Sequence, residues 1–374
     1  MHRKRKGLWA VILGTASTMM ALLLAGYCEA ATGWPQFMGN PSRNGTVLDK
    51  EPKLSPLGEL EWRLSTQGPV ASSPALWGNV VFFGSKDGNL YALDGTNGRT
   101  IWRFPTENWI VSSPAVSEGK VIFGSYDGKV YCVNGSDGKL IWRFTTHNGV
   151  HSSPAIWNGK VFFGGIDGYV YCVSIKTGWQ VWKTKLGREV YSSPVISEGI
   201  VFVGNNDGKL FALDAETGQV MWRAVIGGPI TGSPAIMGDM VFFAGWDGFV
   251  YGARIKHRAV IWRFKADAYI DSSPLAYDGK LYVGDMSGRL YCLDPYSGNL
   301  IWSFKTHSGI QSSPSGGAGR VYVGSNDDAL FCLDAKTGDL LWKAKVGGNV
   351  TTSTALGDGF AFFGSLDGAI YKVR

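Results

Sequence analysis

Apolar and polar positions alternate along this chain in short runs that return every 40 residues. In the stretch 110–144, an extended segment at 110–116 is followed by β-branched and aromatic runs at 120–125, 130–134 and 140–144. Turns that contain Gly, Asp or Ser separate the runs. None of the runs shows the periodicity of a helix. Each unit is therefore predicted to form four short antiparallel strands, which is the pattern typical of one β-propeller blade.

Two columns of identical residues fix the number of units. Ser-Ser-Pro or a close variant ends at Pro74 and at every fortieth residue up to Pro314, and Ser353-Thr354 holds the eighth position. A tryptophan column runs in parallel with it, at Trp62, Trp102, Trp142, Trp182, Trp222, Trp262, Trp302 and Trp342. We expect these indoles to be structural, because an aromatic side chain fills the space between neighbouring sheets and contributes on the order of 5 kcal/mol at most.

The two ends of the array are out of phase with the blades. Residues 60–66 supply a lone fourth strand, and the chain finishes with a third strand at 370–374. If these strands pair, both edges are hidden and the ring closes. We therefore predict an all-β, eight-bladed propeller of four-stranded antiparallel blades over residues 58–374, closed by the N-terminal strand on the C-terminal blade.

The first 30 residues have the character of a signal peptide. A basic start at 3–6 precedes an apolar run at 8–24 and then small residues, so we expect residues 1–30 to be removed on export and residues 31–57 to form a lead-in segment. Two alternatives stay open. The first is a retained membrane anchor, and the second is lipidation at Cys28, although Tyr27 interrupts the lipoprotein pattern.

The charge of the chain narrows the range of partners, and the spacing of its cysteines argues against disulfides. The chain has a formal charge of +6, and the leader holds four of its 36 basic and one of its 30 acidic residues, which leaves 32 against 29 and hence +3. No long basic run remains, so we expect no nucleic-acid partner. The remaining cysteines share one repeat position, too far apart between blades for disulfides, so we expect buried free thiols at Cys132, Cys172, Cys292 and Cys332.

Function is expected where the repeat varies. The connection into each blade and the hairpin between its second and third strands emerge on the same face, and the residues before Asp-Gly and before Ser-Ser-Pro differ from blade to blade. Aromatic and Arg side chains there suit a protein or glycan surface, with solvated loop residues as the alternative interpretation. The candidate binding face consists of Trp109, Tyr126, His147, His151, Arg188, Glu189, Tyr191, Trp246, Tyr269 and Asp271.

Catalytic and metal sites are poorly supported by the same residues. His147 and His151 are four apart, but on an extended segment this spacing does not place both rings on one face. The recurrent Asp-Gly pairs are explained by two-residue type I′ hairpins rather than by calcium loops. The serines recur in nearly every blade, whereas a nucleophile is needed only once. We expect no catalytic, metal or cofactor-binding residue.

The segments 211–222 and 331–342 resemble the tryptophan-docking repeat of the PQQ-like (quinoprotein-type) propellers, and the resemblance extends over about residues 58–374. Residues 34–41 are similar to the lead-in found before such propellers. For a quinoprotein dehydrogenase, the resemblance would imply pyrroloquinoline quinone with calcium over the axis. The chain lacks the adjacent cysteines and long insertions of those enzymes, and is more similar to the BamB-like non-catalytic branch, although its repeats are more regular and its lipoprotein pattern is broken.

We therefore expect an exported, non-enzymatic β-propeller scaffold that binds through its loop face. It is expected to be monomeric and to reside in the periplasm, at the cell surface or outside the cell. Its partner is expected to be a protein or a cell-surface polymer. A PQQ-dependent dehydrogenase or a quinone-binding sensor is the main alternative, and a small-molecule-binding subunit of an envelope complex is the third.

Overall fold

A computed structural model describes residues 37, 39–40 and 58–374 of this chain. The expected signal peptide, with its anchor and lipidation alternatives, lies outside the described residues. So does most of the lead-in segment.

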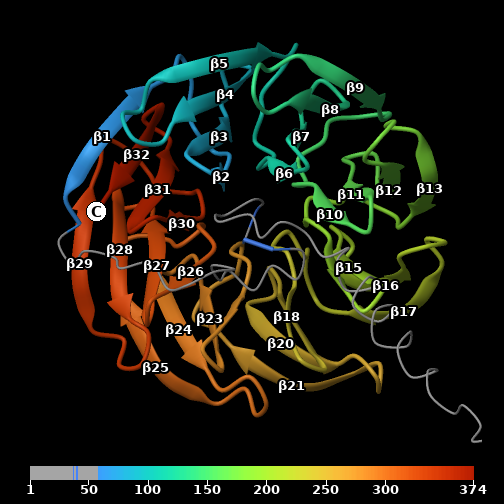
Figure 1. Cartoon of the computed structure of the whole chain (residues 1–374). Helices are drawn as coiled ribbons and strands as arrows, with labels where there is room; N and C mark the ends of the chain where they lie inside the picture. Colours follow the sequence, from blue (N-terminus) through green and yellow to red (C-terminus); the bar gives the residue numbers. More distant parts are fainter. Residues whose placement is uncertain (1–36, 38, 41–57) are drawn as a thin grey trace, which may run out of the picture. The chain divides into compact units, whose positions relative to one another are not determined.

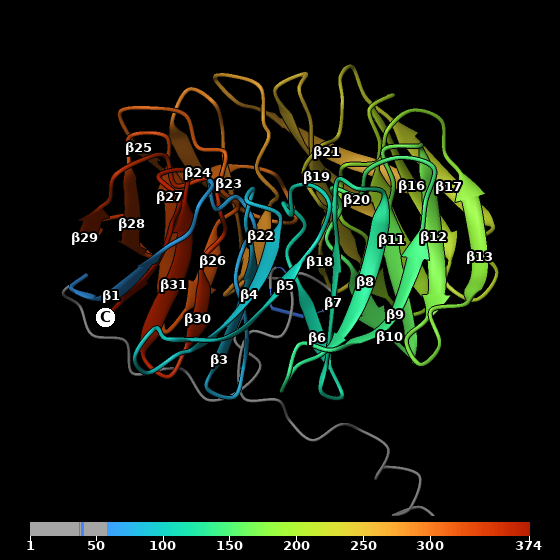
Figure 2. The same ribbon diagram turned by 90° about the horizontal axis from the view of Figure 1, so that it is seen from above.

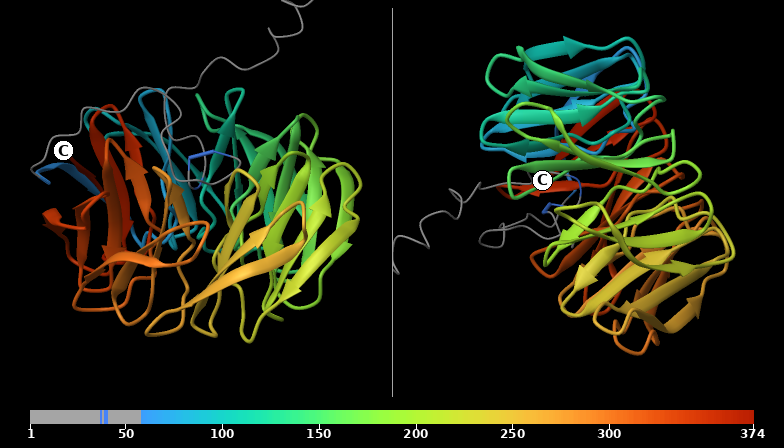
Figure 3. Two further views of the ribbon diagram at one scale, coloured as in Figure 1. Left: turned by 90° about the horizontal axis from the view of Figure 1, so that it is seen from below. Right: turned by 90° about the vertical axis from the view of Figure 1, so that its right-hand side faces the viewer.

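Residues 58–374 form eight four-stranded antiparallel sheets arranged around a central channel (Figure 1). The all-β, eight-bladed fold is as predicted. Figure 2 shows the strands running between two faces that carry the connections, and Figure 3 shows the same arrangement from two further directions. The part of the chain that the structure describes contains no helix that is long and apolar enough to cross a membrane.

Within each blade the strands follow one another outward from the channel. The inner strands are β2 (Ala75–Trp77), β6 (Ala115–Ser117), β10 (Ala155–Trp157), β14 (Val195–Ser197), β18 (Ala235–Met237), β22 (Leu275–Tyr277), β26 (Ser315–Gly317) and β30 (Ala355–Gly357). The second strands are β3 (Val80–Gly84), β7 (Lys120–Gly124), β11 (Lys160–Gly164), β15 (Ile200–Gly204), β19 (Met240–Ala244), β23 (Lys280–Gly284), β27 (Arg320–Ser325) and β31 (Phe360–Ser365).

The third strands are β4 (Asn89–Asp94), β8 (Lys129–Asn134), β12 (Tyr169–Ser174), β16 (Lys209–Asp214), β20 (Phe249–Arg254), β24 (Arg289–Leu293), β28 (Ala329–Asp334) and β32 (Ala369–Val373). The outer strands are β1 (Leu60–Ser65), β5 (Thr100–Pro105), β9 (Leu140–Thr145), β13 (Gln180–Lys185), β17 (Val220–Val225), β21 (Ala259–Lys265), β25 (Leu300–Lys305) and β29 (Leu340–Lys345).

The inner strand is shorter than the predicted 110–116. In the second blade it starts only at Ala115, because the serines before it use their hydrogen bonds between blades and along the neighbouring strand. Ser112 Oγ donates to the Ser152 carbonyl at 3.0 Å and accepts from the Gly124 amide at 3.1 Å. Residues 110–114 thus form part of the channel wall and do not pair with the neighbouring strand of the sheet.

The turn geometry differs from the prediction for Asp-Gly. Of the pair Asp127-Gly128 only the glycine has a positive φ, at 83°, and Gly128 donates its amide to the Ser125 carbonyl at 3.2 Å. This is a three-residue hairpin with a glycine bulge, not a type I′ turn. The two-residue turn with two positive φ angles lies at the other end of the blade, at Glu118 (51°) and Gly119 (71°).

Ring closure follows the prediction. β1 pairs antiparallel with β32, from Leu60 opposite Val373 to Ser65 opposite Ala369. The Lys372 side chain lies in this last blade at the repeat position that holds Ala, Cys or Gly elsewhere. It is buried, its Nζ donates to the Gly95 carbonyl at 3.0 Å, and it lies 3.6 Å from the Phe360 ring centroid. Burial lowers the pKa of Lys372.

The tryptophans dock each blade onto the next. Trp142 is 8% exposed, and its indole N–H donates to the Ile175 carbonyl of the following blade at 2.9 Å. A Cβ on Gly178 would lie 2.7 Å from this ring, and the φ of Gly178 is 71°. Glycine is therefore required here both by the close approach and by the backbone conformation.

Two features protect the outer edges of the sheets. Each outer strand has a register shift just before its tryptophan, as between Cys172 and Val173 opposite β13, and such bulges twist an edge away from intermolecular pairing. A charged residue follows the tryptophan in most blades, for example Arg143 in β9.

The four cysteines of the described residues, Cys132, Cys172, Cys292 and Cys332, are buried and free, as predicted. Burial raises the pKa of each thiol to about 12.

Candidate functional site

We call the face that carries the second-to-third-strand hairpins the mouth face, and the opposite face the turn face. At the mouth face the channel wall is a ring of serines. The backbone amide of Ser73 donates to Ser113 Oγ of the next blade at 3.0 Å, and Ser353 donates to Ser73 Oγ at 2.9 Å across the closure. The same bond joins most other neighbouring blades. The recurrent serines therefore have a structural role between blades.

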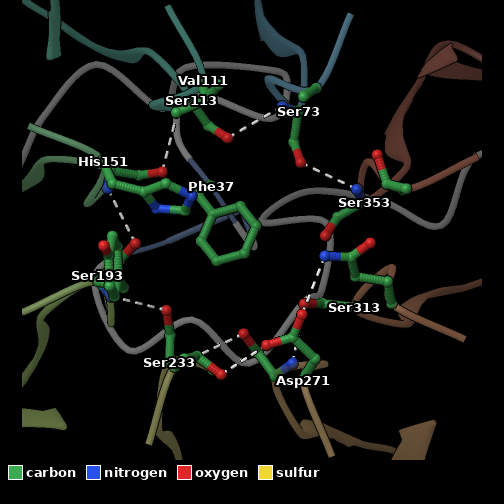
Figure 4. Close-up of a pocket in the computed structure, with 18 of the residues that line it drawn as sticks. Phe37, Ser73, Val111, Ser113, His151, Ser193, Ser233, Asp271, Ser313 and Ser353 are labelled. Atoms are coloured by element: carbon green, nitrogen blue, oxygen red, sulfur yellow. Dashed lines mark hydrogen bonds between the residues drawn. The ribbon is translucent and has the colours of Figure 1, made fainter. Parts of the chain in front are cut away.

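A cavity of about 410 Å³ lies above this ring. The residues that precede the serine pairs surround it, and they are different in nearly every blade: Ala71, Val111, His151, Tyr191, Thr231, Asp271, Gln311 and Thr351. Lys86, Tyr126, Trp246 and Leu366 of the hairpins add to the rim, and Trp109 lies beside them. Figure 4 shows the Phe37 ring inside the circle of serines.

One side of the cavity is an aromatic arc, formed by Trp109, Tyr126, His151 and Tyr191. Neighbouring ring centroids along the arc are separated by 6.2, 6.0 and 5.1 Å, and the His151 ring meets the Tyr191 ring at 85°. Lys86 Nζ lies 5.2 Å from the Trp109 ring centroid, within the range of a cation–π interaction. The arc presents ring edges and faces to the cavity, a geometry that favours contact with further aromatic groups.

The other side is a hydrogen-bonded cluster that we call the Asp271 network. Asp271 Oδ1 accepts from the Thr231 hydroxyl at 2.6 Å and from the Trp246 indole N–H at 3.2 Å. Asp271 Oδ2 accepts from the Gln311 amide at 2.9 Å. The donors come from the two blades that flank the blade of Asp271: Thr231 and Trp246 from the fifth blade and Gln311 from the seventh. This carboxylate therefore fixes the position of the Trp246 ring at the rim.

The aromatic arc also affects protonation. Burial lowers the pKa of His151, and the nearby Lys86 charge acts in the same direction, while the Asp271 charge opposes them. Burial likewise raises the pKa of Tyr126 to about 12. Both side chains are therefore neutral near pH 7, and the charges of the cavity rim are those of Lys86 and Asp271.

The structure brings together six of the ten predicted binding residues around the cavity: Trp109, Tyr126, His151, Tyr191, Trp246 and Asp271. Tyr269 lies beside them, with its ring centroid 5.4 Å from that of Trp246. His147, Arg188 and Glu189 lie on surrounding loops. The backbone amides of His147 and Arg188 donate to Asp167 and Asp207, and Glu189 accepts from Asn206 at 3.3 Å.

Several residues that line the cavity were not among the predicted candidates, and four of them make contacts that matter to the site. Lys86, Thr231 and Gln311 occupy the two variable columns, so their position was visible in the sequence, but their contacts with Trp109 and Asp271 were not. Phe37 had no such signal, because it lies outside the repeat and nothing in the sequence places it in the channel.

The Asp-Gly aspartates hold the rim in place. Asp127 Oδ1 accepts from the Lys129 amide at 2.9 Å, and Oδ2 accepts from the Tyr131 hydroxyl at 2.7 Å. Oδ2 also accepts from the Glu107 amide in the connection from the preceding blade, at 3.2 Å. One carboxylate thus joins a hairpin, a strand and the neighbouring loop, and burial together with Asp127 raises the pKa of Tyr131.

The cavity residues do not fit a calcium–quinone pair. Calcium takes about six to eight oxygen ligands, whereas Asp271 is the single carboxylate of the rim and both of its oxygens accept from protein donors. Pyrroloquinoline quinone is itself a polycarboxylate, and Lys86 is the single cation among the lining residues. Within the described ranges, no group of three or more His, Cys, Asp or Glu side chains could hold a metal ion.

Comparison with known families decides the relationship. The sequence model described as outer membrane protein assembly factor BamB matches residues 46–109, 86–168, 166–313 and 247–373, which together span the propeller. This chain belongs to that family. The PQQ-like, BamB-like resemblance seen in its repeats is thus confirmed. Among individually curated proteins, no relative matches.

Solved structures share the fold at low sequence identity. BamB from Moraxella catarrhalis is 16% identical, with a TM-score of 0.74 over 84% of this chain and 99% of that one. The computationally designed protein Ika8 is 19% identical, with a TM-score of 0.76 over 87% and 100%. The quinohemoprotein alcohol dehydrogenase from Comamonas testosteroni is 16% identical, with a TM-score of 0.74 over 94% and 82%. An assembly factor, a designed protein and an enzyme therefore share this fold, so the fold alone does not decide the function.

Proposed function

We propose that this protein is an exported, non-enzymatic scaffold that binds a protein of the cell envelope through its mouth face. The observation that carries the proposal is the concentration of aromatic side chains at the mouth. Trp109 and Trp246 are 49% and 47% exposed, and Tyr269 is 44% exposed. Aromatic and basic side chains that are exposed before binding are typical anchors of protein interfaces.

The two tryptophan anchors are also held in fixed positions. Trp246 is held by Thr231 and Asp271, and Trp109 by its contacts with Lys86 and Tyr126. A side chain that is already fixed loses little conformational freedom when the partner binds, so more of its contact energy appears as affinity. A protein is favoured over a cell-surface polymer because the family description names an assembly factor for proteins.

A pull-down from the native envelope tests this proposal. We expect Trp109→Ala with Trp246→Ala to abolish capture of the partner while the melting temperature stays within a few degrees, because both side chains are half exposed. Trp179→Ala is the matched control, since Trp179 is 79% exposed and follows the β12–β13 turn on the turn face. Unchanged capture by the double variant would contradict the proposal. Retention of a polysaccharide instead of a protein would show that the partner is a cell-surface polymer.

A quinone-dependent enzyme is the alternative that this proposal must exclude. Pyrroloquinoline quinone and calcium should be added to the purified protein, and its absorption spectrum and dye-linked oxidation of alcohols and sugars measured. We expect neither a spectral shift nor turnover, because the rim offers too few oxygen ligands and cations. Turnover with the quinone would overturn the scaffold proposal.

A further inference from the structure

The cavity at the mouth holds an aromatic side chain of the chain itself. Phe37 lines the cavity together with the serine ring, the aromatic arc and Asp271 (Figure 4). It is half-buried and packs against the core cluster that Leu275 and Ile310 of the sixth and seventh blades help to form. A ring from outside the repeat therefore lies in the cavity among side chains that the blades contribute.

The walls around Phe37 suit such a ring. On one side the aromatic arc offers His151 between Tyr126 and Tyr191 in edge-to-face arrangements. On the other side the Trp246 indole is fixed by the Asp271 carboxylate. Aromatic rings in offset or edge-to-face arrangements interact favourably beyond the area that they bury, so the wall selects for an aromatic group over an aliphatic one.

The floor limits how deeply a ligand enters. The serine hydroxyls lie below the arc as a polar ring, and most of them accept from a backbone amide of a neighbouring blade in the bonds described above. An apolar group that went deeper would bury these hydroxyls away from water, at a cost.

The space exceeds what Phe37 fills. A cavity of about 410 Å³ remains with Phe37 as part of its wall, which lies within the ~300–1,000 Å³ typical of ligand pockets. A partner's ring that packs against the same part of the arc and floor as Phe37 has to take its place, and the remaining space can hold the rest of that segment. Phe37 therefore acts as a stand-in for the natural occupant.

From this we infer that the mouth cavity is the receptor for one aromatic side chain on an extended segment of the protein partner, which displaces Phe37. The inference rests on the proposed function and specifies its partner. Phe37 competes with an external ligand for the cavity. The apparent affinity for that ligand is therefore the intrinsic affinity multiplied by the fraction of molecules in which Phe37 has left the cavity. Phe37 consequently sets the affinity for the partner without contacting it.

The test uses the full chain and a labelled peptide with the sequence of residues 33–41, GWPQFMGNP. We expect the Phe37→Ala protein to bind this peptide at least about fivefold more tightly than the wild type does, which is the scale expected when an internal competitor that fills most sites is removed. The peptide with Ala in place of its Phe should not bind. Phe37→Leu, which keeps an apolar side chain, should give an intermediate affinity.

The envelope partner gives the second readout. Phe37→Ala should raise the affinity for the captured partner by a factor similar to that for the peptide, with an unchanged melting temperature. If partner affinity is unchanged or lower, or if the peptide does not bind Phe37→Ala, the receptor inference is wrong. Tighter binding of a neutral polysaccharide in place of the peptide also overturns it. The proposed function would fail separately, through unchanged capture by the double tryptophan variant.

Discussion

The two faces of this propeller use the same repeat in opposite ways. On the turn face, each blade receives the tryptophan of its predecessor, as Trp142 lies against Gly178 and bonds to the Ile175 carbonyl. On the mouth face, equivalent positions differ from blade to blade, and one of them is His151 where another is Asp271. The docking of the blades and the variable surface are thus separated along the same strands, so the variable positions can change without loss of the tryptophan docking.

The largest expected effect concerns the turn face. Trp142→Ala should lower the free energy of unfolding by about 3–5 kcal/mol, because it leaves a cavity and an unpaired Ile175 carbonyl between blades. Denaturant unfolding measures the change. Trp179→Ala, on the same face but 79% exposed, is the control and should change stability by less than about 0.5 kcal/mol. Equal losses in the two variants would contradict the docking role of the tryptophan column.

The next effect concerns the link between hairpin and loop at the mouth. Asp127→Ala should cost about 2–3 kcal/mol, because the Tyr131 hydroxyl and the Lys129 and Glu107 amides all lose their acceptor. The control is Asp137→Ala, whose carboxylate accepts from the Lys139 amide in an exposed turn, and its effect should be far smaller. If the two variants unfold at the same denaturant concentration, the aspartate does not hold the rim.

A smaller effect should appear with pH. The folded-state pKa of His151 lies below its ordinary value of 6.5, so the unfolded chain takes up a proton first as the pH falls. Stability is unaffected above about pH 6.5 and decreases below it, by no more than about 1.4 kcal/mol per pH unit. His151→Gln should flatten this part of the curve. A wild-type and variant pair with parallel stability curves between pH 7 and 5 would show that the His151 imidazole is not responsible.

The sequence predicts the scaffold better than the site because the scaffold repeats. Trp62 to Trp342 and the serine pairs recur at one spacing, and the lone strand at 60–66 can pair only with the unfinished blade at the end. The Asp-Gly turns were predicted wrongly because the pair does not reveal the length of the loop around it. The short inner strands were missed because serine hydrogen bonds between blades are invisible in one repeat.

The site depends on contacts between blades, and these are not periodic. Variation in two columns identified Tyr126, His151, Trp246 and Asp271 as neighbours of the channel. Their pairing could not be predicted, because Thr231, Asp271 and Gln311 come from three consecutive repeats and meet only when neighbouring blades pack against each other. Phe37 lies in no repeat at all.

The most direct test of the separation between the faces is site-specific photo-cross-linking in the native envelope. A photoreactive phenylalanine analogue would replace Tyr126 at the mouth in one protein and Trp179 on the turn face in another, with both proteins checked for unchanged melting temperatures. We predict that the partner cross-links to position 126 and not to position 179. Cross-linking at position 179, or at neither position while the partner is still captured, would contradict the assignment of recognition to the mouth face.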